Sequence, residues 1–241
     1  GKTISIDELK AEGFQGIFVG SGAGLPNFMD IPGENALNIM SSNEYLTRVN
    51  LMDAANPSTD TPINLGKKVL VVGGGNTAMD SCRTAKRLGA DVTLVYRRSE
   101  AEMPARIEEV KHAKEEGIKF LTLHNPKEYL TDENGAVKAA VLDVMQLGEP
   151  DQSGRRRPET TGETITIEYD QVIVAVGVSP NPLVPKSIEG LTLGRKNTIA
   201  VNDQMQSSRK EIYAGGDIVR GGATVILAMG DGRRAAMNMS K

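Results

Sequence analysis

The segment 67–98 constrains the fold of this chain more than any other. It opens with an apolar, β-branched run at residues 68–72, which predicts a buried parallel strand. Three glycines follow, then a helical segment to Leu88, and then a second apolar run at residues 92–96. A strand, a glycine turn, a helix and a second strand in this order predict a βαβ unit of a nucleotide-binding sheet.

The glycines have the spacing of a dinucleotide fingerprint. Gly73, Gly75 and Ala78 match G-x-G-x-x-A, the form that carries alanine in the third position. Gly73 allows a tight turn out of the strand, and Gly75 lets the backbone approach a pyrophosphate because it has no Cβ. Ala78 is small enough for the helix to lie against the sheet. The N–H groups and positive dipole end of the helix would then face the phosphates.

The residues after the second strand distinguish between the two nicotinamide nucleotides. An NAD site usually carries an acid about 20 residues after the glycines, where it binds the ribose 2′-hydroxyl. Here Arg97 and Arg98 lie 22 and 23 positions after Gly75. Two guanidinium groups suit a 2′-phosphate, which an acid would repel, so the pattern predicts NADPH. The alternative, a glycine-rich turn with two solvated arginines, predicts equal affinity for NADH and NADPH.

Composition excludes several classes of protein. The 241 residues suffice for one large or two modest domains, and the net charge of −3 gives no indication of a nucleic-acid or membrane partner. No apolar run approaches the ~20 residues that cross a bilayer. A single cysteine, Cys82, excludes an internal disulfide, a C-x-x-C pair and an Fe–S cluster within the chain. His112 and His124 have no partners spaced for a metal. We therefore expect a reduced, cytoplasmic protein with no metal site.

The βαβ unit extends into a larger domain. Pro104 is expected to begin a helix that runs to Glu116. Further strands are predicted at residues 118–123, 137–146, 164–169 and 170–176. A basic triplet at residues 155–157 lies between two of these strands, and a solvated hairpin tip is a simpler interpretation of it than an anion or partner contact. The layout predicts a Rossmann-like α/β domain over residues 65–176.

The flanking segments, residues 1–64 and 177–241, are expected to pack on each other as a second lobe. A strand ending at Ala214 leads into Gly215-Gly216-Asp217, and a long helix starts near Thr224. An aspartate between glycines at a strand end can accept hydrogen bonds from a polyol. A helix start can place N–H groups against a carbonyl that gains negative charge on reduction. Together these features indicate a flavin site.

These stretches resemble the NADPH-dependent small (beta) subunit of bacterial glutamate synthase and related two-dinucleotide FAD/NADPH oxidoreductases. The resemblance covers residues 43–50, 72–80, 95–105, 147–158, 214–217 and 223–236. It implies a three-layer NADPH domain inserted into an FAD/NAD(P)-binding domain. It also implies hydride transfer from NADPH to FAD without a catalytic acid or base, because the cofactors carry the chemistry.

The resemblance also implies the binding residues. For NADPH they are Gly73, Gly74, Gly75, Asn76, Thr77, Ala78, Arg97 and Arg98, with Val176 and Gly177 near the sheet edge. For FAD they are Gly20, Ser21, Gly22, Gly215, Gly216, Asp217, Thr224 and Val225. The first FAD fingerprint and the cysteine-rich Fe–S region of the family do not occur in this chain. We therefore expect a C-terminal fragment that binds NADPH, holds FAD weakly or not at all, and is inactive alone, with Fe–S clusters only outside it.

The sequence does not decide the identity of the electron acceptor. The resemblance implies electron transfer to the glutamate synthase large subunit, or to another electron acceptor protein, and hence a role in glutamate biosynthesis. One alternative is a ferredoxin- or sulfide-linked NADPH oxidoreductase, which keeps the NADPH site and changes the acceptor. Another is a non-catalytic nucleotide-binding or assembly module. A disulfide reductase is disfavoured because the chain has no C-x-x-C pair.

Overall fold

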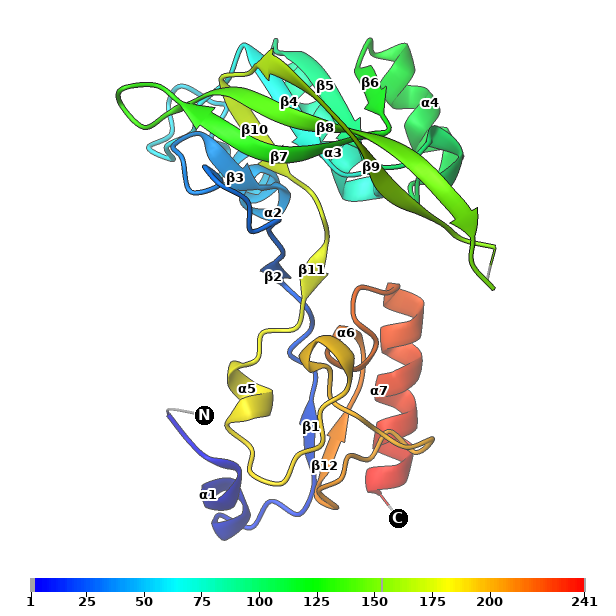
Figure 1. Ribbon diagram of the computed structural model, residues 1–241. Coiled ribbons are helices and arrows are strands. Elements are labelled where there is room, and N and C mark those ends of the chain that lie inside the picture. Colours follow the sequence, from blue (N-terminus) through cyan, green and yellow to red (C-terminus); the bar gives the residue numbers. More distant parts are fainter. Residues whose placement is uncertain (1–2, 153, 241) are drawn as a thin grey trace. The chain divides into compact units, whose positions relative to one another are not determined.

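The structure, a computed structural model that describes residues 3–152 and 154–240, divides into two compact units (Figure 1). The central unit comprises Asn27–Val176. The flanking unit is formed by Gly1–Pro26 together with Gly177–Lys241. Each unit has its own buried core, so each is described by itself.

The central unit is built on a five-stranded parallel sheet. Its strands, in spatial order, are β3 (Ile39–Ser41), β10 (Gln171–Val174), β4 (Lys68–Val72), β5 (Asp91–Tyr96) and β6 (Lys119–Thr122). Strand β4 lies between β10 and β5, with Val71 opposite both Ile173 and Leu94. These three side chains are fully buried, as expected for a parallel sheet that is covered on both faces.

Helices cover one face of this sheet. They are α2 (Ser42–Leu46), which continues into the π-helix η1 (Thr47–Leu51), α3 (Asn76–Arg87) and α4 (Ile107–Glu115); a 3₁₀ turn η2 (Glu100–Glu102) precedes α4. Helix α3 buries Met79 and Cys82 against the sheet. The helix ends at Arg87, and Gly89 follows it with φ of +98°, where its N–H donates to the Lys86 carbonyl and closes the last turn without strain.

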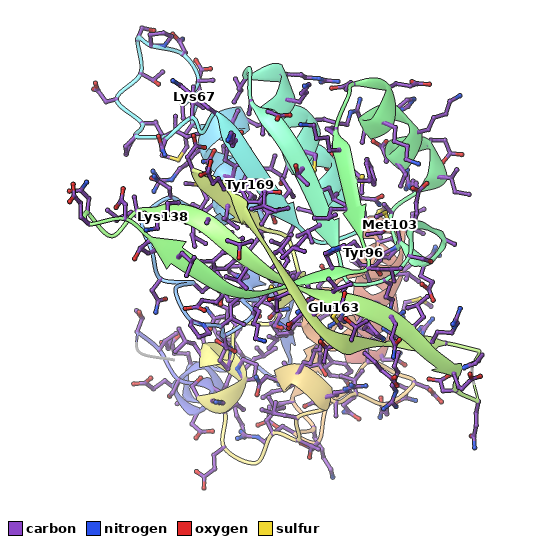
Figure 2. The ribbon with its side chains drawn as sticks, turned by 45° about the horizontal axis from the view of Figure 1, so that its top comes forward. Lys67, Tyr96, Met103, Lys138, Glu163 and Tyr169 are labelled. Carbon is purple, nitrogen blue, oxygen red and sulfur yellow. The ribbon has the colours of Figure 1, made fainter. Side chains whose placement is uncertain are left out.

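A three-stranded antiparallel sheet covers the other face. Its strands, in spatial order, are β7 (His124–Thr131), β8 (Val137–Pro150) and β9 (Arg156–Glu168). Tyr129 and Leu142 pack with Leu70 and Val172 of the parallel sheet in a second core cluster. In Figure 2 the antiparallel sheet crosses in front of the parallel one. Helices, parallel sheet and antiparallel sheet form three layers, so the predicted α/β architecture is confirmed.

The flanking unit contains two small sheets. Strand β1 (Ile17–Val19) runs parallel to β12 (Ile212–Ala214), and β2 (Leu25–Pro26) runs antiparallel to β11 (Val178–Ser179). The helices are α1 (Ile6–Ala11), α5 (Leu183–Lys186), α6 (Asp217–Arg220), α7 (Val225–Met239) and the 3₁₀ turn η3 (Arg195–Asn197). Buried aliphatic side chains join these elements, namely Val19, Ile188, Ile199, Ile212 and Ile218.

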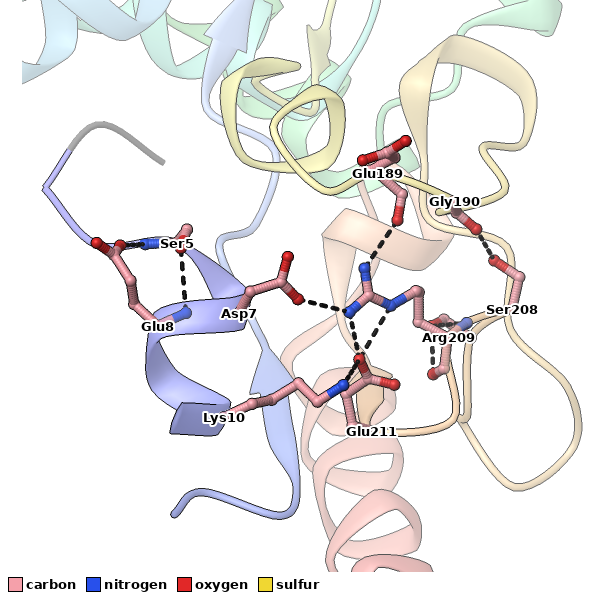
Figure 3. Close-up of polar contacts among 10 residues, drawn as sticks. Ser5, Asp7, Glu8, Lys10, Glu189, Gly190, Ser208, Arg209 and Glu211 are labelled. Atoms are coloured by element: carbon pink, nitrogen blue, oxygen red, sulfur yellow. Dashed lines mark hydrogen bonds and ion pairs between the residues drawn. The ribbon is translucent and has the colours of Figure 1, made fainter. Parts of the chain in front are cut away.

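A polar network fastens α1 to the rest of the flanking unit (Figure 3). The Arg209 guanidinium donates to the Glu211 carboxylate, to Asp7 at 3.2 Å and to the Glu189 carbonyl at 2.9 Å. Lys10 also lies 3.3 Å from Glu211. The hydrogen bond from Arg209 lowers the pKa of the Glu211 carboxyl to about 2. The Glu211 carboxyl is therefore ionised near neutral pH, and the network holds α1 against residues 209–211, which precede β12.

The structure differs from the sequence expectation in residues 27–64. The sequence predicts that this segment belongs to the flanking lobe, but it lies in the central unit. Its strand β3 pairs with β10, and Tyr45, 1% exposed, packs into the helix-side core. The cause is non-local, because pairing with a strand more than a hundred residues away decides where the segment belongs.

The helix predicted to begin at Pro104 begins instead at Ile107. The backbone N–H of Ala105 donates to the Gly74 carbonyl at 3.0 Å. The N–H of Arg106 donates to Asn76 Oδ1 at 2.9 Å. These two donors connect the segment to the glycine turn, so the chain is extended there and the helix starts later.

Candidate functional site

The glycine turn joins β4 to α3 at the carboxyl end of the parallel sheet. Gly73 has φ of +140°, and a Cβ there would lie 2.3 Å from the Ala175 carbonyl oxygen. A Cβ on Gly74 would lie 2.7 Å from the Tyr96 ring. A Cβ on Gly75, in contrast, would meet no described heavy atom within 4 Å. The turn therefore packs against the protein at its first two glycines and is open at the third.

The open glycine is also the start of α3. Gly75 is the N-cap, with extended backbone at φ −92° and ψ 177°, and no side chain caps the helix. The first N–H groups of a helix lack intrahelical acceptors, and the dipole makes this end positive. Asn76 and Thr77 are exposed, while Ala78 is fully buried against the sheet. An anion placed above Gly75 would meet these N–H groups directly.

Two arginines follow β5, and neither has a counter-ion among the described residues. Neither Arg97 nor Arg98 makes an ion pair with any described residue, whereas Arg83 contacts Glu109 at 2.8 Å. Arg97 is exposed, and Arg98 is only 8% exposed. The Nε atom of Arg98 is buried without a hydrogen-bond partner in the described structure. Leaving such a donor unsatisfied costs about 1–3 kcal/mol, so the fold holds a positive charge there at a loss of stability.

Tyr96 connects the glycine turn with the arginines. Its ring lies against Gly74, and its hydroxyl donates to the Glu102 carbonyl at 3.0 Å. Burial raises the pKa of Tyr96, and the positive charges of Arg98, Arg97 and Arg155 oppose that rise. Tyr96 lies beside Met103 in Figure 2. Sequence reasoning missed Tyr96, because its contact with Gly74 depends on how two separate loops fold together.

Two more predicted residues lie at the adjoining strand end. Val176 is the last residue of the central unit and is 38% exposed. Its neighbour Ala175 donates to the Val72 carbonyl at 2.8 Å and places its own carbonyl against Gly73. Gly177, with φ of +95°, begins the return into the flanking unit. The strand end at Val176 thus borders the first glycine of the turn.

In the flanking unit, the other predicted glycines gather at one end of a small sheet. Gly20 follows β1 and Gly215 follows β12, and these two strands are parallel. The turn after β1 is exposed at Ser21 and has φ of +69° at Gly22. Because the carboxyl ends of parallel strands meet at one edge, the two glycine turns share that edge. The structure therefore brings these predicted residues together within one unit.

The second of these turns rests on helix α7. Gly216 has φ of +75°, and its N–H donates to Asp231 Oδ2 at 3.1 Å. Arg220 donates to both oxygens of Asp231 at 2.6 Å. Asp231 is 1% exposed, and the hydrogen bond from Arg220 lowers its pKa. No local pattern signals Asp231, because the turn that it supports lies 15 residues earlier in the chain.

The start of α7 is open. Thr224 is the N-cap, and its hydroxyl accepts from the Leu227 N–H at 3.4 Å. Val225, the first helical residue, is 75% exposed. One oxygen of Asp217 accepts from the Ala223 N–H at 3.0 Å, which ties the glycine turn to this helix start. The arrangement presents a carboxylate and free helix N–H groups near one another.

In the described part of the chain, no group of three or more His, Cys, Asp and Glu residues could hold a metal ion. Cys82 is fully buried, and burial raises the pKa of its thiol. The His124 ring lies 2.7 Å from the Thr122 carbonyl and is part of a strand end. Over residues 3–152 and 154–240, no helix has the length and apolar character needed to cross a membrane.

The amino-acid sequence is similar to those of known oxidoreductases. The sequence matches the pyridine nucleotide-disulphide oxidoreductase family over residues 4–232. It is 36% identical over 260 residues to the NADPH-Fe(3+) oxidoreductase subunit beta of Geobacter sulfurreducens (strain DL-1 / KN400), covering 98% of this chain and 38% of that protein. It is 34% identical over 244 residues to the glutamate synthase [NADPH] small chain of Halomonas elongata. This match covers 98% of this chain and 51% of that protein. The predicted resemblance to glutamate synthase small subunits and related NADPH oxidoreductase subunits is confirmed.

The fold is also known from solved structures. Mycobacterium tuberculosis FprA in complex with NADPH matches with a TM-score of 0.79 at 19% identity, over 98% of this chain and 65% of that one. At this identity the match establishes the fold alone. The chain spans 38% and 51% of the two curated relatives, and 21% of another. The activity and partners of the whole protein are therefore matters for proposal.

Proposed function

The chain belongs to the pyridine nucleotide-disulphide oxidoreductase family, and we propose that it supplies the NADPH site of a cytoplasmic flavoprotein oxidoreductase of the glutamate synthase type. In this proposal the protein passes a hydride from NADPH to FAD. Electrons then leave through Fe–S clusters outside this chain to a partner subunit, where they support glutamate formation. The relatives named as a small chain and as a beta subunit support a partner of this kind.

One observation carries the proposal. The glycine turn is open above Gly75, and two arginines that have no counter-ion in the described part of the chain lie at the end of the neighbouring strand β5. A dinucleotide with its pyrophosphate over the helix start would direct its adenosine ribose toward the end of that strand. Arg97 and Arg98 would then bind the 2′-phosphate, which NADH lacks. We propose Gly73, Gly74, Asn76, Thr77, Ala78 and Val176 as the remaining members of this site, with Gly177 beside it.

The flanking unit has features that fit part of a flavin site. Close packing excludes a side chain at Gly215, because a Cβ there would lie 2.7 Å from the Asp231 Cβ. The Asp217 oxygen that does not bind Ala223 can accept a hydrogen bond from a ribityl hydroxyl. FAD, when bound, supplies the ring that accepts the hydride. We propose Gly20, Ser21, Gly22, Gly215, Gly216, Asp217, Thr224 and Val225 as its contacts.

No side chain in these two sites is required as an acid or a base. Hydride transfer between two cofactors needs position and field, which the glycine turns and helix starts can provide. The open N–H groups at Thr224 and Val225 would stabilise negative charge on a carbonyl of the reduced ring. The two sites therefore hold and orient the cofactors.

The test uses the full-length protein with its co-purified partner. NADPH or NADH is mixed with the flavin-loaded protein in a stopped-flow instrument, and flavin absorbance is followed. The proposal predicts rapid bleaching with NADPH, slow bleaching with NADH, and glutamate production when glutamine and 2-oxoglutarate are added. Bleaching without glutamate formation, but with reduction of added ferredoxin or polysulfide, would favour the alternative acceptors. No NADPH oxidation with FAD supplied would favour an assembly module and end the proposal.

A further inference from the structure

Tyr96, the last residue of β5, lies between the two anion-binding features of the proposed nucleotide site. It directly precedes Arg97 and Arg98, which begin a segment called here the arginine loop, residues 97–106. Its ring packs against the glycine turn, because a Cβ added to Gly74 would lie 2.7 Å from two of the ring atoms. One residue therefore touches the turn on one side and continues into the arginines on the other.

The Tyr96 hydroxyl closes the first part of the arginine loop. It donates to the Glu102 carbonyl at 3.0 Å. The Oε2 atom of Glu102 accepts from the Ser99 N–H at 3.1 Å and from the Ser99 hydroxyl at 2.9 Å. Arg97 and Arg98 lie between Tyr96 and Ser99 in the chain. The residues on both sides of the arginine pair are therefore bonded to the same anchor, Glu102.

The arginine loop then returns to the glycine turn. The Ala105 N–H donates to the Gly74 carbonyl at 3.0 Å, and the Arg106 N–H donates to Asn76 Oδ1 at 2.9 Å. Gly74 is thus contacted by the Tyr96 ring before the loop and by a backbone donor near its end. The turn and the loop form a closed circuit of contacts, and Tyr96 is the side chain that completes it.

The circuit joins two groups that lack partners within the described structure. Helix α3 begins without a side-chain cap at Gly75, and the Nε atom of Arg98 is buried without an acceptor. A nucleotide that carries both a pyrophosphate and a 2′-phosphate can reach both groups only if their separation matches its own. When it does, binding at one group raises the effective concentration at the other. A loop that is held in place beforehand also lowers the entropy cost of binding.

We propose that Tyr96 is a positioning residue, which sets the separation between the pyrophosphate site at Gly75 and the 2′-phosphate site at Arg97 and Arg98. The inference rests on the proposed NADPH site and deepens it. The ring fixes the distance to the glycine turn, and the hydroxyl fixes the loop through Glu102. Part of the preference for NADPH over NADH is thereby assigned to a residue that needs no contact with the ligand.

Tyr96→Phe tests the proposal, because it keeps the ring and removes the hydroxyl. Three probes compete with NADPH in displacement calorimetry on the intact chain. Adenosine 2′-monophosphate reaches only the arginines, adenosine 5′-diphosphate reaches only the turn, and adenosine 5′-diphosphate with an added 2′-phosphate reaches both. The variant should weaken the two-site probe roughly five- to tenfold and leave each single-site probe within about twofold.

Two further variants sharpen the test. Ser99→Ala removes the other hydroxyl bond to Glu102 and should give the same pattern. The double variant Tyr96→Phe/Ser99→Ala should lose less than the two effects added, because both act through one loop. Tyr169→Phe is the matched control. Tyr169 is a buried tyrosine beside the amino end of β4, so the affinities of all three probes should stay unchanged.

The outcomes separate this inference from the proposed function. An equal loss for all three probes in Tyr96→Phe would show that the residue only supports the fold. A loss shared equally by the two probes with a 2′-phosphate would mean that Tyr96 acts on the arginines alone and not on the separation. Unchanged binding of the two-site probe would also overturn the inference, while the NADPH site stands if the wild-type chain prefers that probe to adenosine 5′-diphosphate. Without that wild-type preference, both ideas fail. Circular dichroism checks that each variant is folded.

Discussion

The positive charge of Arg98 contributes little to the stability of the protein alone. Its side chain is 8% exposed, and its buried Nε has no partner among the described residues. Arg98→Met keeps the apolar stem and removes the unsatisfied donor. We expect unchanged or slightly raised thermal stability, because no internal bond is lost. NADPH affinity should fall roughly tenfold or more, while NADH affinity stays nearly constant.

Differential scanning calorimetry and NADPH titration of the same Arg98→Met sample check both parts of this prediction. Arg83→Met is a contrasting variant, because Arg83 makes ion pairs with Glu109 and Glu116, each at 2.8 Å. It should lose stability and keep its NADPH affinity. A marked loss of stability in Arg98→Met with unchanged NADPH binding would show that Arg98 is structural.

Glu116 gives a pH-dependent prediction. Its hydrogen bonds, first from Arg87 and then from Arg83, lower the pKa of the Glu116 carboxyl from 4.5 to about 2. The pairs therefore stabilise the fold fully above pH 4.5, and this contribution is lost as the pH falls toward 2. Glu116→Gln should lower the free energy of unfolding by about 1–2 kcal/mol at pH 7, a value reduced because the pairs are partly exposed.

Urea unfolding at several pH values tests this account of Glu116. The difference between wild type and Glu116→Gln should shrink steadily as the pH is lowered from 4.5 and disappear as the pH falls through about 2. Glu115→Gln is the matched control, since Glu115 is 59% exposed and lies 3.8 Å from Lys111. It should change stability little at any pH. A difference for Glu116→Gln that does not depend on pH would contradict the ion-pair explanation.

Residue types at fixed spacing made part of the site predictable. Gly73, Gly75 and Arg97 follow from a local pattern that any strand–turn–helix unit of this kind requires. Tyr96 and Asp231 could not be found in that way. Tyr96 matters through its contact with Gly74, and Asp231 through a bond to Gly216 from a distant helix. Such roles depend on tertiary contacts, which a sequence pattern does not encode.

At the scale of elements, the first and third glycines of the glycine turn have different roles. Gly73 is expected to affect stability, and Gly75 is expected to affect NADPH affinity. Gly73→Ala should destabilise the protein by about 2–3 kcal/mol, because the new Cβ would meet the Ala175 carbonyl at 2.3 Å. Gly75→Ala should change stability by less than about 1 kcal/mol, since nothing described lies within 4 Å. It should nevertheless weaken NADPH at least about tenfold, because the methyl group would occupy the pyrophosphate position.

Thermal unfolding and NADPH titration of the two glycine variants give four values that must follow this pattern. A stable Gly75→Ala protein with wild-type NADPH affinity would mean that the nucleotide does not lie over the third glycine. A fully stable Gly73→Ala protein would mean that the turn is less constrained than its φ of +140° indicates.

Element boundaries were predictable where the pattern was local. Strands β4, β5 and β10 are mostly apolar segments that the sequence predicts as strands, and they occupy the centre of the sheet. The start of α4 was not, because Ala105 and Arg106 use their N–H groups to bind the glycine turn. Strand β3 is only three residues long and is defined by its pairing with β10. Short elements of this kind carry no periodic signal.

At the scale of the whole molecule, the two units are expected to respond differently to nucleotide. A ligand stabilises the part of the native structure that binds it, by about 2.7 kcal/mol at a hundred times its Kd. Hydrogen exchange with NADPH should therefore slow the amides at the start of α3 and the end of β5. Amides of α1, in the flanking unit, should exchange at unchanged rates. Equal protection of α1 and α3 would contradict a site in the central unit.

The large-scale organisation was only partly evident from the sequence. The α/β class followed from alternating apolar runs and helices. The assignment of residues 27–64 did not, because β3 and Tyr45 join the central unit through contacts with distant strands and helices. The resemblance to glutamate synthase small chains rests on stretches that are spread over the chain. It therefore does not depend on which unit contains residues 27–64.

The central claim is that the arginines after β5 recognise a phosphate that only NADPH carries. The most direct test is the ratio of the Kd values for NADH and NADPH, measured by calorimetry on the intact chain and on the double variant Arg97→Ala/Arg98→Met. The account predicts a ratio of at least about tenfold for the wild type, and a ratio near one for the variant. A wild-type chain that binds both nucleotides equally, or a variant that keeps the wild-type ratio, would contradict it.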